Sequence, residues 1–347
     1  MNMENNRIIV IGASSGGFEV LKNLVRELPE DFPAAIFIVW HMSAQAYGIL
    51  PSVLAREGKL KAANAIDREI ITPNRIYAAP PNRHLIVEPG HVRVTLGPKE
   101  NRFRPAIDPL FRSAAWAYGS RVIGVILSGA LDDGVAGLWT IKSKGGVTVV
   151  QDPADAEFPS MPQSALRAVK TDYCLPAREI PDLLTNLAHE QIADAPGEVM
   201  SEDKRTELEI QIAAETNSSE SNIMDYGTLS PYACPDCHGV MTQLQDGSIV
   251  RFRCHTGHAF SANSLLEGLT ENTEESLWNS IRAIEEIIML LNQMGAESSR
   301  NNSELSALYF EKAHAAEQSV QALRDIIRQN EKNSEDIIQI ESQENLE

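Results

Sequence analysis

A glycine-rich turn that contains serine follows the first apolar run of the sequence. The turn reads GASSGG over Gly12–Gly17 and comes directly after Ile8–Ile11. A helical pattern begins at Phe18, so the order is apolar run, turn and helix, which indicates a strand that enters a helix N-terminus. Such a junction gathers backbone N–H groups and a positive helix end at one point. Ser14 could therefore hold a phosphate or act as a nucleophile.

The details of the turn favour the nucleophile. The dinucleotide fingerprint needs a glycine where Ser14 stands, and the lysine of a P-loop is missing. The next apolar run ends in Trp40, His41 and Met42 instead of the acidic residue that would bind a ribose. Gly12–Gly16 fits the G-x-S-x-G pattern of a nucleophile elbow. Besides a phosphate site and a nucleophile, a third interpretation is that Gly12–Gly17 forms only a tight structural turn between a strand and a helix.

A serine nucleophile needs a base and an acid that orients the base. His41 follows the apolar run that ends at Trp40, and Asp132 and Asp133 follow the run over Val122–Leu127. Because strand ends of open α/β sheets converge on one crevice, these side chains are expected to meet Ser14. Spacing does not choose between the two aspartates, and either could instead cap the helix that follows.

A second group of reactive side chains lies late in the chain. Four residues have the types and spacing of zinc ligands: Cys234, Cys237, Cys254 and His258. A C-x2-C pair is followed, after 16 residues, by Cys254, which is the separation of the two knuckles of a zinc ribbon. His255 and His238 are weaker candidates for the fourth ligand. We expect a closed, structural zinc site and no metal catalysis, with reduced thiols without metal as the alternative.

Short apolar runs alternate with helical patterns through the first half of the chain, which predicts a doubly wound α/β fold with a mostly parallel sheet and helices on both faces. The expected strands are Ile8–Ile11, Ala35–Trp40, Arg75–Ala79, Leu85–Val87 with Val92–Leu96, Val122–Leu127 and Gly146–Val150. The expected helices include Phe18–Leu28, Pro109–Tyr118 and Val135–Lys144. Cys174 occupies a strand-like position and is predicted to lie in the core.

Changes in composition predict five parts. These are a catalytic domain (1–187), an acidic flexible linker (188–226), a zinc-ribbon-like module (227–268), a helical hairpin (269–330) and an acidic tail (331–347). Within the linker a short helix around Leu208–Ala214 is possible. Asn272, with Glu275 three residues later, resembles a capping box that would start the first hairpin helix. The apolar stripes of the hairpin could pack together, on the catalytic domain or on a partner.

Composition limits the classes of partner. The formal charge of −18 over 347 residues argues against nucleic acid or an anionic membrane as the main partner. The N-terminus lacks an apolar signal segment, and the longest apolar run is too short to cross a bilayer. The four cysteines do not have the pattern of a disulfide framework. We therefore expect a cytoplasmic protein without membrane insertion.

At this point a family resemblance becomes specific. Six blocks, in order, resemble the catalytic domain of CheB-type protein-glutamate methylesterases of bacterial chemosensory systems: IGASSGG (11–17), WHMS (40–43), IYAAPPNRHL (76–85), RFRPAIDPLF (102–111), GVILSGALDDGVAG (124–137) and FPSMPQSA (158–165). The resemblance implies an α/β domain with a Ser-His-Asp triad, which by motif position corresponds to Ser14, His41 and Asp133. It also implies hydrolysis of glutamyl methyl esters, with possible deamidation of glutamines, on methyl-accepting chemosensory receptors, without a catalytic cofactor.

The sequence departs from the family at several points. Ala130 replaces a methionine near the triad, and Trp40 and Ser43 replace a glutamine and a proline beside the histidine. Many members carry an N-terminal receiver domain, whereas this chain begins close to its first strand, so control by a receiver is expected to be absent. Arg102 and Arg104 could dock an acidic receptor surface or simply pair locally. The competing function is a non-catalytic adaptor that binds receptor helices and recruits other chemosensory proteins through the zinc and helical modules.

Overall fold

The computed structural model describes residues 6–42, 48–190, 203–216 and 222–343, of which 331–343 are described as helix only. The chain divides into two compact units, Met1–Leu266 and Glu267–Glu347. Each unit has a hydrophobic core of its own.

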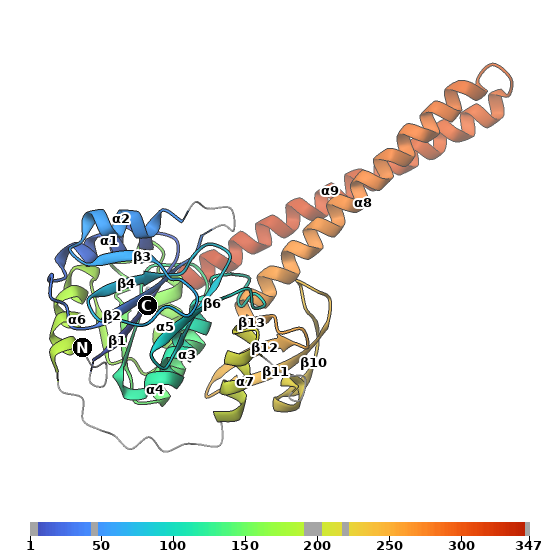
Figure 1. Ribbon diagram of the computed structural model, residues 1–347. Coiled ribbons are helices and arrows are strands. Elements are labelled where there is room, and N and C mark those ends of the chain that lie inside the picture. Colours follow the sequence, from blue (N-terminus) through green and yellow to red (C-terminus); the bar gives the residue numbers. More distant parts are fainter. Residues whose placement is uncertain (1–5, 43–47, 191–202, 217–221, 344–347) are drawn as a thin grey trace. The chain divides into compact units, whose positions relative to one another are not determined.

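A seven-stranded sheet forms the centre of the first unit (Figure 1). Its strands, in spatial order, are β3 (Lys61–Asn64), β4 (Arg75–Ala78), β2 (Ala35–Trp40), β1 (Ile8–Ala13), β7 (Val122–Ile126), β8 (Val147–Gln151) and β9 (Tyr173–Leu175). Every neighbouring pair is parallel. The central strands are apolar throughout because helices cover both faces of the sheet.

Two helical layers enclose the sheet, which confirms the doubly wound α/β fold. On one face Val10 packs in a core with α3 (Ile107–Tyr118), α4 (Val135–Ser143) and α5 (Ser160–Ala168). On the other face Ile11 packs in a core with α1 (Gly17–Glu27), α2 (Leu50–Glu57) and α6 (Ile180–His189). Short 3-10 turns occupy Gly119–Arg121, Ala177–Glu179 and Ile223–Tyr226.

The outer parts of this unit differ from the expectations. The expected strand pair around Leu85 and Val92 forms a separate antiparallel sheet of β5 (His84–Glu88) and β6 (His91–Thr95), because its two-residue Pro-Gly connection is too short for a parallel crossover. Strand β3 was not anticipated. The prediction that Cys174 lies in the core is wrong, since this residue is exposed on the edge strand β9.

A small antiparallel sheet follows in the same unit, with strand order β10 (Thr228–Ala233), β11 (Val240–Asp246), β12 (Ile249–Cys254) and β13 (Ala259–Ser261). We call residues 228–261 the ribbon. Helix α7 (Asp203–Ala213) lies within the expected flexible linker, and its Leu208 and Ile212, one turn apart, are buried in a cluster with Leu244 of the ribbon. The middle of that segment is therefore an ordered helix, while 191–202 and 217–221 lie outside the described residues.

Two long helices, α8 (Ala262–Ser298) and α9 (Ser303–Gln343), confirm the predicted helical hairpin. Ile281, Val320 and Ile327 form its buried contact. Helix α8 begins ten residues before the expected cap at Asn272, because the Ser261 hydroxyl accepts a hydrogen bond from the Ser264 N–H (3.0 Å) and so acts as the cap. Part of the predicted acidic tail is helical, and 344–347 lie outside the described residues.

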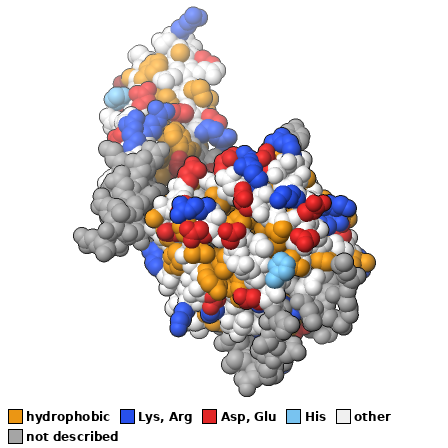
Figure 2. All heavy atoms as spheres, turned by 90° about the vertical axis from the view of Figure 1, so that its left-hand side faces the viewer, with side chains coloured by type: hydrophobic (Ala, Val, Ile, Leu, Met, Phe, Trp, Pro, Cys, Tyr) orange, Lys and Arg blue, Asp and Glu red, His pale blue; other side chains and the backbone are white. Residues whose placement is uncertain are grey.

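The described helices include none that is long and apolar enough to span a bilayer. Figure 2 shows one face of the molecule on which lysine and arginine side chains alternate with acidic ones, around gathered hydrophobic side chains. This mixture on that face differs from the basic stripe typical of a nucleic-acid-binding surface.

Candidate active site and metal centre

The carboxyl ends of three neighbouring strands carry the predicted catalytic side chains. Strands β1 and β2 are paired along their length, with Ala13 opposite Trp40, so Ser14 and His41 are the next residues on adjacent strands. Strand β7 lies on the other side of β1, and Asp133 follows it in a loop. The parallel arrangement thus brings the three segments to one edge of the sheet.

The serine turn is held by main-chain contacts around Ser14. The Ser14 N–H donates to the Ser128 carbonyl, and the Ser14 carbonyl accepts from the Gly17 N–H, both at 3.0 Å. The indole N–H of Trp40 donates to the same Ser14 carbonyl at 3.0 Å. A Cβ atom on Gly129 would lie 2.8 Å from the Ser14 Cβ, so glycine is required where the β7 loop passes. These contacts fix the direction of the serine side chain.

His41 connects the serine to the aspartate. Its Nδ1 lies 3.1 Å from the Ser14 Oγ, and its Nε2 lies 2.8 Å from Asp133 Oδ2. The ring of Phe103 stacks on the imidazole with 3.7 Å between centroids and an interplanar angle of 6°. The three residues are buried, with 7% of Ser14, 8% of His41 and 1% of Asp133 exposed.

Asp133 accepts hydrogen bonds on both carboxylate oxygens. Oδ2 accepts from His41 and from the Ile107 N–H (2.7 Å), while Oδ1 accepts from Asn101 Nδ2 (2.9 Å) and the Asp108 N–H (3.3 Å). Ile107 and Asp108 are the first residues of α3, so the carboxylate lies at a positive helix end. Because an ionised carboxylate only accepts, His41 must carry its proton on Nε2, which leaves Nδ1 to accept the Ser14 proton.

The neighbouring aspartate has a different partner. Asp132 Oδ1 accepts a hydrogen bond from the Ser261 hydroxyl at 2.6 Å. Of the two aspartates that spacing left open, it is therefore Asp133 that lies against His41.

Several residues of the site were missed by the sequence reasoning. Trp40 was noted only as the end of a strand and as a departure from the family, and Phe103 only as part of a family block. Asn101 stands just outside that block. Asn101 has a left-handed backbone (φ 48°), which asparagine tolerates better than most residues. No sequence pattern joins it to Asp133, because the two are brought together by the fold.

Asp108 is a further buried acid beside the triad. It accepts from the Gly137 N–H at 2.6 Å and from Asn101 Nδ2 at 2.9 Å. Burial, and then the nearby charge of Asp133, raise the pKa of Asp108 to about 7. The Asn101 amide therefore lies between the Asp133 carboxylate and the carboxyl group of Asp108, whose ionisation the charge of Asp133 opposes.

Of the two arginines considered for docking, Arg104 has local partners. Its guanidinium donates to Asn82 Oδ1 at 3.0 Å and to the carbonyls of Leu96 and Gly97 at 2.9 Å each. The contacts therefore favour local pairing for Arg104. Ala130 is exposed on the loop before Asp133, and Ser43 lies outside the described residues.

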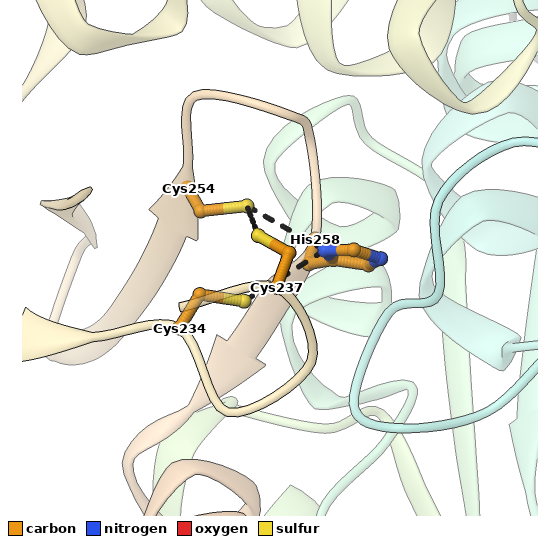
Figure 3. Close-up of side chains that lie close together, drawn as sticks. All are labelled: Cys234, Cys237, Cys254 and His258. Carbon is orange, nitrogen blue, oxygen red and sulfur yellow. Dashed lines mark hydrogen bonds between the residues drawn. The ribbon is translucent and has the colours of Figure 1, made fainter. Parts of the chain in front are cut away.

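The four predicted metal ligands come together at one end of the ribbon (Figure 3). Their candidate ligand atoms all lie within 4.8 Å of one another. Cys234 and Cys237 come from the connection between β10 and β11, whereas Cys254 and His258 flank the turn between β12 and β13. The cluster contains neither His238 nor His255.

The distances between the candidate ligand atoms fit tetrahedral coordination of one metal ion. The Sγ atoms of Cys237 and Cys254 are 3.8 Å apart, and His258 Nδ1 lies 3.7 Å from Cys234 Sγ and 3.6 Å from Cys254 Sγ. Zinc bonds of about 2.3 Å to sulfur and about 2.0 Å to nitrogen would set such atoms roughly 3.5 to 3.8 Å apart. The hydrogen bond between Cys234 and Cys254 lowers the pKa of Cys254 and raises the pKa of Cys234, so of these two thiols Cys254 is the one that ionises more readily. Three thiols and one imidazole are a donor set that suits zinc.

Comparison with known proteins identifies relatives of the first half of the chain. The family model for CheB methylesterase matches residues 9–184. A protein-glutamate methylesterase/protein-glutamine glutaminase of Anaeromyxobacter dehalogenans is 39% identical over 180 residues, which are 52% of this chain and 53% of that relative. A protein of Leptospira interrogans that carries the same name provisionally is 40% identical over 184 residues, 53% of this chain and 95% of that relative.

A solved structure supports the fold over the same half of the chain. The CheB methylesterase catalytic domain of Thermotoga maritima matches with a TM-score of 0.51 and 35% sequence identity. The match covers 52% of this chain and 98% of that domain. The parallel sheet, the family match and these relatives together lead to one assignment: the chain belongs to the CheB methylesterase family.

Proposed function

We propose that the protein is a serine esterase that hydrolyses glutamyl methyl esters on methyl-accepting chemosensory receptors. The observation that carries this proposal is the hydrogen-bonded series from Ser14 Oγ through both ring nitrogens of His41 to Asp133 Oδ2. The family match and the names of the relatives support a glutamyl methyl ester as the substrate. The receptor that carries the ester is proposed from the resemblance to the CheB-type enzymes of chemosensory systems.

The first half of the reaction forms an acyl-enzyme. Ser14 Oγ attacks the ester carbonyl carbon while His41 Nδ1 takes the hydroxyl proton. Backbone N–H groups of the glycine turn, where α1 begins, would hold the oxyanion, each donor contributing about 3 kcal/mol. When the tetrahedral intermediate collapses, the bond to the methoxy oxygen breaks, and His41 gives its proton to the departing methanol.

The second half returns the enzyme to its starting state. Water attacks the acyl carbon as His41 again takes a proton, and the proton then passes to Ser14 Oγ as the glutamate leaves. Asp133 stays ionised, keeps the proton of the neutral ring on Nε2 and stabilises the imidazolium that forms in each half. A glutamine side chain would follow the same path and release ammonia.

The test is methanol release from a methylated receptor. The wild type is compared with Ser14→Ala and with the matched control Ser15→Ala, which removes the exposed neighbouring hydroxyl. We expect Ser14→Ala to lose at least about 1,000-fold in rate and Ser15→Ala to stay close to wild type. Equal release by the wild type and Ser14→Ala would remove Ser14 from this role. No release by the wild type would favour the non-catalytic adaptor.

We further propose that Cys234, Cys237, Cys254 and His258 hold one structural zinc ion. Thr256 Oγ1 lies 2.9 Å from Cys254 Sγ and 3.2 Å from Cys237 Sγ, so its hydroxyl can support the thiolates. Metal analysis of purified protein is expected to give one zinc per chain, lost in Cys237→Ser and kept in Cys174→Ser. Cys174 is exposed and lies outside the cluster, so it is a matched control. Wild-type protein without zinc would contradict this assignment.

A further inference from the structure

Asn101 joins the triad to the ribbon through a fully used side-chain amide. Its Nδ2 donates to Asp133 Oδ1 and to Asp108 Oδ2, each at 2.9 Å. Its Oδ1 accepts from the Ser261 N–H at 2.8 Å and from the Ser264 hydroxyl at 3.1 Å. An amide has two donors and two acceptor positions, so every one is occupied.

The orientation of this amide is determined by its partners. The Ser261 N–H can only donate, and it therefore requires the oxygen of Asn101 on the ribbon side. The nitrogen then faces the carboxyl groups. Asn101 is only 4% exposed, and Ser264 is fully buried, so water does not compete for these bonds. Movement of the ribbon end would pull on a group that holds Asp133.

The same chain segment is tied to the residues beside the metal ligands. Ala259, directly after His258, donates its N–H to the Lys99 carbonyl (3.2 Å) and accepts from the Asn101 N–H (2.7 Å). Arg253, directly before Cys254, donates to Glu100 Oε1 at 2.7 Å and to the Gly257 carbonyl at 2.8 Å. Both sides of the turn that carries Cys254 and His258 thus contact residues 99–101.

We infer that the ribbon is a positioning element of the esterase, in which metal binding fixes β13 and, through Asn101, the orientation of Asp133. This inference rests on the proposed function of the triad. It adds that metal binding in the ribbon regulates the activity of the triad. A bound ion joins the two ligand pairs, and its removal leaves the turn before β13 without that link. Asn101 is then a positioning residue, and esterase turnover depends on occupancy of a site outside the reaction centre.

The experiment is a double-mutant cycle of Asn101→Ala and Cys237→Ser on the full chain. We expect each single variant to lower kcat by about 10- to 100-fold with little change in KM, because one charge-assisted hydrogen bond to Asp133 is lost or misdirected. If the ribbon acts through Asn101, the double variant loses no more than Asn101→Ala alone. Additive losses, or full activity of Asn101→Ala, would overturn the inference.

Two further readouts separate positioning from general damage. The downfield proton resonance of the His41–Asp133 hydrogen bond should shift or broaden in Asn101→Ala and Cys237→Ser, and stay as in wild type in Cys174→Ser. Asn101→Ala should keep its zinc. An unchanged resonance in both variants would contradict the inference.

If Cys237→Ser does not fold, a chelator is used to remove the metal instead of that substitution. A zinc chelator should then lower kcat of the wild type reversibly and leave Asn101→Ala unchanged, whereas equal relative losses in both would reject the coupling. Failure of the proposed function looks different, because the wild type itself would then release no methanol.

Discussion

At the scale of single residues, the two nitrogens of His41 have separate tasks. Nε2 donates to Asp133 and Nδ1 faces Ser14. The ring nitrogen that contacts the serine is therefore Nδ1, the one nearer the main chain. The ring is stacked on Phe103, and the carboxylate is held by four donors. Little freedom remains in the proposed base, His41, and the proposed acid, Asp133, and such preorganisation is what acyl transfer needs.

The two adjacent aspartates offer a matched test of this arrangement. Asp133→Asn keeps the shape but can place an amide N–H against Nε2, which favours the wrong tautomer of His41, and kcat should fall by roughly 10,000-fold. Asp132→Asn keeps an oxygen that can accept from Ser261, and its loss should stay below about tenfold. Steady-state methanol release measures both. A larger loss from Asp132→Asn than from Asp133→Asn would contradict the assignment.

At the scale of elements, a buried network of ion pairs attaches the ribbon to the catalytic fold. Glu100 accepts from Arg112 of α3 at 2.8 Å and from Arg253 of β12 at 2.7 Å. Glu209 of α7 accepts from Arg251 of β12 at 2.8 Å. These carboxylates are almost completely buried, so each arginine is needed to offset their desolvation.

This network predicts a specific loss of stability in acid. Burial alone would raise the pKa of Glu100, but the charges of Arg112 and Arg253 lower that pKa to about 2. Its stabilisation is therefore complete above about pH 4.5 and is lost as the pH falls toward 2. Glu100→Gln should lower the free energy of unfolding by about 3–5 kcal/mol at pH 7, because buried guanidinium groups lose their partner, and by much less near pH 3.

Urea denaturation at pH 7, 5 and 3 measures this difference. Glu57→Gln is the matched control, since Glu57 pairs with Arg26 at the surface and its loss should be small at every pH. A gap between wild type and Glu100→Gln that does not change with pH would count against the network.

The central elements were predictable from sequence, and the contacts between distant segments were not. Apolar runs such as those ending at Ala13 and Trp40 identify buried parallel strands, and the side chains that follow them fall into the crevice. Strand β3 escaped prediction. A short helix around Leu208–Ala214 was expected, but its packing was not, because the burial of Leu208 against Leu244 comes from tertiary structure. The role of Asn101 depends on partners 32 and 160 residues away, which no local pattern encodes.

At the scale of the whole molecule, the family domain and the ribbon share one compact unit. The family match ends at residue 184, whereas α7 and the ribbon, within 203–261, lie beyond it and still pack on the catalytic fold. The hairpin forms the second unit, closed by contacts such as Arg324 with Glu285 at 2.7 Å. The region beyond the family match thus contributes to the environment of the triad.

Metal removal should therefore change the stability of the first unit. An ion bound only by the folded ribbon adds to its free energy of unfolding according to its concentration relative to its Kd. A chelator should lower the melting temperature of the wild type by several degrees. The expected shift is about 4 °C or more where the free zinc concentration before chelation is about 100 times the Kd. Calorimetry with and without chelator measures the shift, and Cys237→Ser should show none. Zinc-loaded protein that melts identically in both conditions would contradict a structural metal.

The most direct test of the account is covalent trapping of the nucleophile. A fluorophosphonate reacts with an activated serine, losing fluoride as the Oγ–P bond forms, and mass spectrometry counts the adducts. We predict one adduct per chain on the peptide that contains Ser14, unchanged in Ser15→Ala and absent in Ser14→Ala and His41→Ala. An adduct that persists in Ser14→Ala, or that forms at full rate without His41, would contradict the proposed catalytic serine.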